Sequence, residues 1–189
     1  MDKTFVSQLS RISRWLLIAL AVALLAPAGA IAADRSALER SARSAYQKLV
    51  AKVPAAKALS SNAVAVLVFP KITKAGLIVG GQYGDGVLFK GGTVAGYYNT
   101  AGASYGLQAG AQRYGYAMFF MNDKALNALT ANEGFEVGVG PSVVVVDQGM
   151  GKSLTTTTAN DDIYAFIFSQ KGLMAGIGVQ GNKITRLQP

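Results

Sequence analysis

Residues 63–69, Ala-Val-Ala-Val-Leu-Val-Phe, form an unbroken apolar run that stops at Pro70. A short run of this kind, rich in β-branched residues and closed by a proline, predicts a buried strand. Similar segments follow, and we predict further strands at residues 75–83, 87–90, 93–99, 103–112, 114–121, 135–140, 142–147, 163–170 and 173–180. Predicted turns lie at Gly84-Asp85-Gly86, Gly91-Gly92 and Gly181-Asn182. About nine short strands at this spacing predict a glycine-rich, strongly curved antiparallel β-sheet, barrel- or sandwich-like.

The residues before the first strand have helical spacing instead. Apolar residues at intervals of three and four predict a helix from Arg35 to Val53, with Asp34 as its N-cap. A shorter helix is predicted from Ala55 to Leu59, and another, at Asn122–Ala131, interrupts the strands with its first residue as the cap. The predicted fold class is therefore α+β, with N-terminal helices and one inserted helix.

The first residues of the chain have the layout of a secretion signal. Three basic residues precede an apolar run at residues 15–26, and Ala30-Ile31-Ala32 forms an A-x-A cleavage site. We therefore predict a signal peptide at residues 1–32 and a single domain at residues 33–189. That domain is expected in the periplasm or secreted, and peripherally associated with a membrane. The alternative is an uncleaved membrane anchor, because the apolar stretch counted through Ala33 is 19 residues long.

Positive charge is concentrated in one part of the chain. The 189 residues contain 18 Lys and Arg and 10 Asp and Glu, a net charge of +8. Residues 34–74 contain eight basic and two acidic residues, whereas residues 75–189 contain seven of each. Opposite its apolar stripe, the predicted N-terminal helix carries Arg40, Arg43, Lys48 and Lys52. Such a face is typical of helices that bind an anionic membrane surface. The alternative is a helix whose stripe packs on the sheet while its charges simply face water.

The composition argues against catalysis. The chain has no Cys and no His, so it lacks a thiol nucleophile, the commonest general base and the commonest metal ligand. We interpret Asp161 and Asp162 as part of a solvated loop, with calcium binding through Asn160 and this pair as a weaker alternative. Gly151-Lys152-Ser153 resembles the end of a P-loop, but the threonines at 155–158 make a poor helix behind it. We predict no enzyme activity, no catalytic residue, no metal site, no cofactor and no nucleic-acid partner.

Several longer motifs occur together across residues 37–185. They are Phe69-Pro70-Lys71-Ile72-Thr73-Lys74-Ala75-Gly76, Gly80-Gly81-Gln82-Tyr83-Gly84-Asp85-Gly86-Val87-Leu88, Ala103-Ser104-Tyr105-Gly106-Leu107-Gln108-Ala109-Gly110, Phe119-Phe120-Met121-Asn122-Asp123-Lys124-Ala125-Leu126, Ile163-Tyr164-Ala165-Phe166 and Ser169-Gln170-Lys171-Gly172-Leu173-Met174-Ala175-Gly176. In this order they resemble the SYLF family of lipid-binding domains.

The resemblance implies binding of anionic phospholipids, with phosphoinositide-type headgroups favoured in eukaryotic members, and no enzymatic activity. It implies lipid contacts through the basic N-terminal helical region and through Lys71 and Lys74 of the first motif. The expected lipid-binding residues are therefore Arg40, Arg43, Lys48, Lys52, Lys71 and Lys74. For a bacterial envelope protein, phosphatidylglycerol or cardiolipin is the expected target, and the actin binding of eukaryotic relatives is not carried over.

Two other functions fit the sequence. The chain could be a structural envelope protein that binds another protein or a cell-wall polymer through its sheet. A barrel cavity for a small apolar ligand is the third possibility.

Overall fold

The computed structural model describes residues 28–76, 79–105, 110–146, 160–172 and 181–188. The chain divides into two compact units, Met1–Ala37 and Leu38–Pro189. Of the first unit the structure describes residues 28–37, which begin the helix α2 (Ala28–Lys52). The predicted secretion signal therefore lies almost wholly outside the described residues. None of the described helices combines the length and the apolar character needed to cross a membrane.

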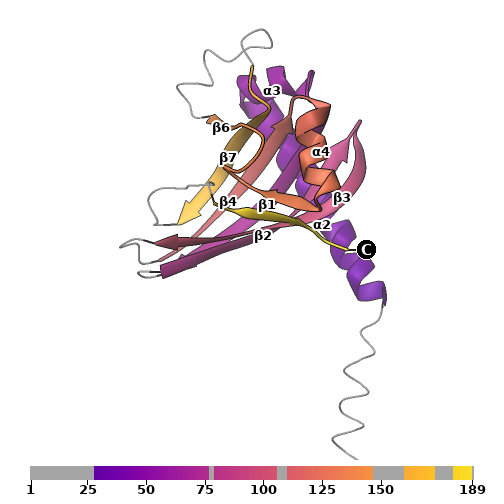
Figure 1. Ribbon diagram of the computed structural model, residues 1–189. Coiled ribbons are helices and arrows are strands. Elements are labelled where there is room, and N and C mark those ends of the chain that lie inside the picture. The colour runs from indigo at the N-terminus through magenta and orange to yellow at the C-terminus, as the bar shows by residue number, and fades with distance from the viewer. Residues whose placement is uncertain (1–27, 77–78, 106–109, 147–159, 173–180, 189) are drawn as a thin grey trace, which may run out of the picture. The chain divides into compact units, whose positions relative to one another are not determined.

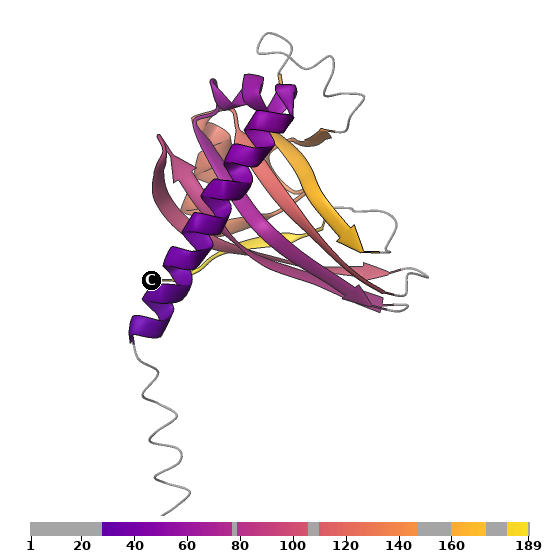
Figure 2. The ribbon, with the colours of Figure 1, turned by 180° about the vertical axis from the view of Figure 1, so that it is seen from behind.

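The second unit contains the rest of α2, two more helices and one sheet, and Figures 1 and 2 show that this sheet is strongly curled. The strand order is β5-β8-β3-β2-β1-β4-β7-β6. The elements are α3 (Pro54–Ser60), β1 (Ala65–Gly76), β2 (Val79–Lys90), β3 (Thr93–Tyr105), β4 (Gly110–Phe120), α4 (Asp123–Ala131), β5 (Gly134–Glu136), β6 (Val143–Val146), β7 (Ile163–Gly172) and β8 (Lys183–Arg186). The predicted α+β class with a strongly curved sheet is confirmed.

Strand β1 lies at the centre of the sheet and is buried on both faces along its first half. Leu67 and Phe69 belong to one core, which also contains residues of α4, and we call this side of the sheet the inner face. Val66 and Val68 point the other way, into a second core shared with α2 and α3, on what we call the outer face. Since successive strand residues face opposite sides, an unbroken apolar run is what a doubly covered strand requires. Figures 1 and 2, seen from opposite sides, show α4 over one face and α2 over the other.

Two predicted interruptions of the central strands are wrong. Pro70 does not end β1, because a bulge between Phe69 and Ile72 accommodates it, and at a bulge the missing N–H of proline is tolerated. The Gly84-Asp85-Gly86 segment is not a turn but lies inside β2. A Cβ on Gly86 would lie 2.5 Å from the Phe69 ring, so this glycine is needed for close packing across the curled sheet.

Three further differences concern strand boundaries and directions. The predicted strand at 75–83 is divided between β1 and β2, and the one at 103–112 between β3 and β4. Strand β8 was not predicted, and the predicted strand at 173–180 lies outside the described residues. The sheet is not purely antiparallel, because β6 pairs with β7 in parallel through Val143–Val146.

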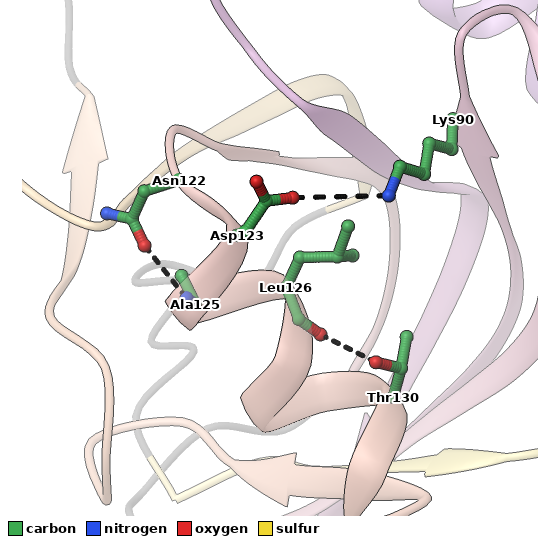
Figure 3. Close-up of polar contacts among 6 residues, drawn as sticks. All are labelled: Lys90, Asn122, Asp123, Ala125, Leu126 and Thr130. Atoms are coloured by element: carbon green, nitrogen blue, oxygen red, sulfur yellow. Dashed lines mark hydrogen bonds and ion pairs between the residues drawn. The ribbon is translucent and has the colours of Figure 1, made fainter.

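The helices agree more closely with prediction. Helices α3 and α4 are confirmed, and the Asn122 side chain caps α4 by accepting a hydrogen bond from the Ala125 N–H at 2.8 Å (Figure 3). The same view shows the ion pair between Lys90 and Asp123, whose nitrogen and oxygen lie 4.0 Å apart. The prediction that Asp34 is an N-cap is wrong, because α2 begins at Ala28 and Asp34 lies within the helix.

Candidate functional site

Helix α2 is anchored to the outer face of the sheet from Leu38 onward. Ala42 and Leu49 are buried, with exposed fractions of 0% and 3%, and both belong to the outer core. The ring centroids of Tyr46 and Phe119 are 6.1 Å apart, so an aromatic contact adds to this packing. The apolar stripe of α2 is thus already used within the protein, and only the opposite side of the helix is available for another surface.

The side chains of Arg40, Arg43, Lys48 and Lys52 are all exposed. Consecutive helix residues are rotated by about 100°, which places Arg43 and Lys52 about 180° apart around the axis, with Arg40 and Lys48 between them. The four cations therefore form a broad band around the free side of the helix. A flat anionic surface lying along α2 can contact Arg40 together with the cations on one side of it, either Arg43 or Lys48 and Lys52.

Arg43 lies at one edge of the band and is positioned by the sheet. Its Nη1 donates a hydrogen bond to the Gly92 carbonyl at 2.9 Å, and its guanidinium lies 4.7 Å from the centroid of the Phe89 ring. The Gly91-Gly92 turn, with positive φ angles of 58° and 79°, was predicted, but its contact with Arg43 was not. The two partners are 49 residues apart, and the sequence pattern carries no signal for that pairing.

A cavity of about 280 Å³ opens beside Arg43. It lies where α2, the start of β1 and the β2–β3 turn meet, and its polar lining comes from Arg43, Gln47 and Ser60 and from the backbone of Gly91 and Gly92. The Ser60 hydroxyl already donates its hydrogen to the Lys57 carbonyl at 2.7 Å, which leaves the Gln47 amide and the Arg43 guanidinium as the side-chain donors for an anionic group of modest size.

The helical layer has few acidic groups to neutralise its cations. Residues 38–60 contain five basic residues and one acidic residue, Glu39. The Glu39 carboxylate accepts a hydrogen bond from the Tyr97 hydroxyl on β3. Lys48, Lys52 and Lys57 form no ion pair within the residues that the structure describes. Uncompensated positive charge therefore remains on this side of the unit.

Lys71 and Lys74, the two lysines taken from the first motif, do not lie together. Lys71 is exposed at the bulge of β1. Lys74 is only 4% exposed, and its register partners Gln82 and Gln112 are buried as well. It shares the inner face with Ile72, so the structure separates it from the basic band on α2.

The acidic pair before β7 has structural contacts. The Asp162 carboxylate accepts hydrogen bonds from Asn122 Nδ2 at 2.9 Å and from the Ser142 N–H at 3.1 Å. The hydrogen bond from Asn122, followed by that from Ser142, lowers the pKa of Asp162. Asp161 accepts a weaker bond from the Tyr164 hydroxyl at 3.3 Å. Within the described ranges no three acidic residues gather as metal ligands, and residues 151–153 fall outside those ranges.

Replacement Asp162→Ala is expected to destabilise the fold by about 1 kcal/mol at neutral pH, since two hydrogen bonds to a carboxylate are lost. Because the pKa of Asp162 is lowered in the folded state, its contribution is fully present above about pH 4 and disappears as the pH falls through the folded-state pKa. Thermal melting of both proteins between pH 7 and pH 2 should therefore show a difference that vanishes in acid. Vesicle binding should not change, and a large loss of it would show that this pair belongs to the binding site.

The described part of the second unit is a curled α+β sheet with a basic helix packed on one face. The family model of Ysc84, described as Las17-binding protein actin regulator, matches residues 101–188, from within β3 to beyond β8. This match confirms the resemblance to the SYLF family over residues 101–188. The family is one of binding domains, and the match is consistent with a lipid-related role. A comparison with curated proteins gave no match.

Proposed function

We propose that this protein binds anionic phospholipid membranes without catalysing a reaction, and that the exposed cations of α2 make the main contact. The observation that carries this proposal is the band formed by Arg40, Arg43, Lys48 and Lys52 on a helix whose apolar stripe is already buried against the sheet. A helix with no apolar face to insert binds a membrane through surface charge.

The expected strength of this interaction follows from the number of cations. Each Lys or Arg near an anionic membrane surface contributes about 1 kcal/mol, so four of them give binding that is readily measured. The cavity beside Arg43 supplies a place where a single headgroup phosphate could contact Arg43, Gln47 and the turn at Gly91-Gly92. Lys71, which is exposed on β1, is a secondary contact in this proposal.

The headgroup and the location belong to the same proposal. Phosphoinositide-type recognition is suggested by family resemblance, and phosphatidylglycerol or cardiolipin is the corresponding target in a bacterial envelope. The predicted signal peptide at residues 1–32 supports a periplasmic or secreted protein at the membrane surface. The actin-related description of the matching family concerns its named members, and we do not extend it to this chain.

Co-sedimentation with liposomes tests this proposal. Vesicles of pure phosphatidylcholine are expected to leave the protein in the supernatant, whereas vesicles with about one third phosphatidylglycerol sediment it, and raising the salt concentration releases it. Equal sedimentation with neutral and anionic vesicles would contradict the proposal. Interaction through the sheet would then be favoured, where Val79 and Tyr83 are 60% and 52% exposed.

A further inference from the structure

The cavity beside Arg43 combines a cationic group with an apolar wall. Arg43, Tyr46 and Gln47 line it from one side of α2, since residues three and four positions apart share a helix face. Val66 and Phe89, which are register partners on β1 and β2, line it from the sheet. Apolar side chains such as these contact carbon atoms, so a ligand that fits the cavity has a carbon portion as well as an anionic group.

The polar side chains of this cavity include both donors and an acceptor. Arg43 uses one N–H for the Gly92 carbonyl, and its other N–H groups, which have no partner among the described residues, can donate to an anionic oxygen. The Ser60 hydroxyl already donates to the Lys57 carbonyl, so toward a ligand its oxygen can only accept. The Gln47 amide forms no hydrogen bond within the described part of the chain and offers both a donor and an acceptor.

An acceptor beside a cation selects among anionic ligands. A ligand that reaches the Ser60 oxygen must itself donate a hydrogen bond, which a hydroxyl or an ammonium group can do. An ammonium group is disfavoured, because it would lie near the Arg43 guanidinium and none of the described lining residues is acidic. The ligand that matches these groups is therefore an anion with a free hydroxyl.

The volume of the cavity limits the size of that ligand. A water molecule occupies about 30 Å³ in the liquid, so a cavity of about 280 Å³ accommodates roughly nine non-hydrogen atoms at that density. A phosphoglycerol headgroup has about ten such atoms and matches this volume. A phosphoinositol headgroup has about sixteen and would extend well beyond the cavity, whereas a phosphate alone would leave much of the apolar wall without a contact.

We propose that this cavity is a site for a glycerol phosphodiester, such as the headgroup of phosphatidylglycerol, and that it distinguishes this headgroup from others of equal charge. The Arg43 guanidinium and the Gln47 amide donate to the phosphate oxygens, Ser60 Oγ accepts from a glycerol hydroxyl, and the carbon atoms contact the apolar wall. For a lipid headgroup, this inference rests on the proposed function, which itself needs only the charge of α2. A free glycerol phosphodiester offers the same chemistry, and the experiment separates the two sources.

The test compares vesicles that have the same charge but differ in hydroxyl groups. Phosphatidylethanol has the single negative charge of phosphatidylglycerol, but its headgroup carries no hydroxyl. At equal mole fractions in phosphatidylcholine, the full chain is expected to bind phosphatidylglycerol vesicles about fivefold more tightly, the effect of about one hydrogen bond.

Two variants that leave the net charge unchanged locate this preference. Ser60→Ala removes the acceptor and should bring the affinity ratio of the two vesicles close to one. Ser61→Ala is the matched control and should keep the wild-type ratio, because its hydroxyl also donates to a carbonyl three residues earlier, that of Ala58, yet Ser61 lies outside the cavity lining. Ala63→Leu places a larger side chain at the lining and should abolish the preference as well, while both anionic vesicles still bind through α2.

A soluble probe identifies the source of the ligand. Glycerophosphoglycerol, the deacylated lipid, is titrated into the full chain labelled with ¹³Cζ-tyrosine. The signal of Tyr46, which lines the cavity, should shift and saturate, whereas that of Tyr83, outside the lining, should not change. If the probe shifts Tyr46 but neither vesicle binds, the ligand is a free glycerol phosphodiester and the proposed function is wrong.

The vesicle comparison can overturn the inference without the proposed function. If the wild type binds both anionic vesicles equally, the cavity does not recognise the headgroup, and binding through the charge of α2 still stands. A preference that persists in both Ser60→Ala and Ala63→Leu would likewise overturn the inference, because the hydroxyl would then be recognised elsewhere. If neither vesicle binds and the probe leaves Tyr46 unchanged, both the inference and the proposed function are wrong.

Discussion

Replacing Arg40, Arg43, Lys48 and Lys52 together by Gln is expected to lower the affinity for anionic vesicles by about two orders of magnitude or more. Each of these exposed cations contributes about 1 kcal/mol near the membrane surface, and the substitution removes four of them from one helix. Gln is nearly as good a helix former as Arg or Lys, so α2 should remain folded. Co-sedimentation at several salt concentrations measures both the affinity and its salt dependence, and most of that dependence should disappear.

The control removes the same amount of charge elsewhere. Lys124, Lys171, Lys183 and Arg186 are exposed and lie outside α2, and their joint replacement by Gln should lower vesicle affinity far less. Equal losses in the two variants would mean that only the net charge of the protein matters. The band on α2 would then be a solvated helix face, and the membrane contact would lie elsewhere.

Phe119→Ala is expected to destabilise the protein by about 3–5 kcal/mol. Phe119 is fully buried on the outer face, and its ring centroid lies 5.2 Å from that of Phe166 in an edge-to-face arrangement and 6.1 Å from that of Tyr46 on α2. Its truncation leaves a cavity and removes both aromatic contacts. Urea denaturation gives the free energy of unfolding, and the melting temperature should fall by about 10 °C for a domain of this size.

Tyr83→Ala provides the comparison, since this aromatic ring is 52% exposed and should cost less than about 1 kcal/mol. A comparable loss in the two variants would contradict the assignment of Phe119 to a packed core between α2 and the sheet. In Phe119→Ala, α2 is also expected to become more susceptible to proteolysis than the central strands, because its attachment is weakened first.

The sequence predicted those parts of the fold in which local pattern and packing agree. Residues 65–69 of the predicted run at 63–69 form the doubly buried half of β1, and the spacing of Ala42 and Leu49 correctly identified the buried stripe of α2. The cap at Asn122 was also predictable, because its side chain acts on a backbone N–H only three residues away.

Where tertiary packing decides the structure, the local pattern was not sufficient. Gly84 and Gly86 are residues typical of turns, yet both lie inside strand β2. Neighbouring groups leave no room for a Cβ at either position, so glycine is needed there for packing. Conversely, the predicted strand at 75–83 is divided between two strands, although the stretch contains no proline, asparagine or aspartate that would mark a turn. Lys74 shows the same limit among the expected lipid-binding residues. The bulge near Pro70 determines which face of β1 this lysine occupies, and its burial is visible only in the folded sheet.

The lengths of the strands at the two margins of the sheet affect how the protein behaves at high concentration. The described sheet ends at β5 and β6, with three and four residues, whereas β1 to β4 have between 11 and 13. A short edge strand itself offers few unpaired backbone groups to a second molecule, so edge-to-edge aggregation through β5 or β6 is disfavoured. Strand β8 pairs with β3 at residues 98–101, and detachment of β5 and β8 would free these residues too, leaving the whole 13-residue strand β3 as a template for intermolecular pairing. Substitutions that loosen those two strands should therefore promote self-association before they unfold the central core.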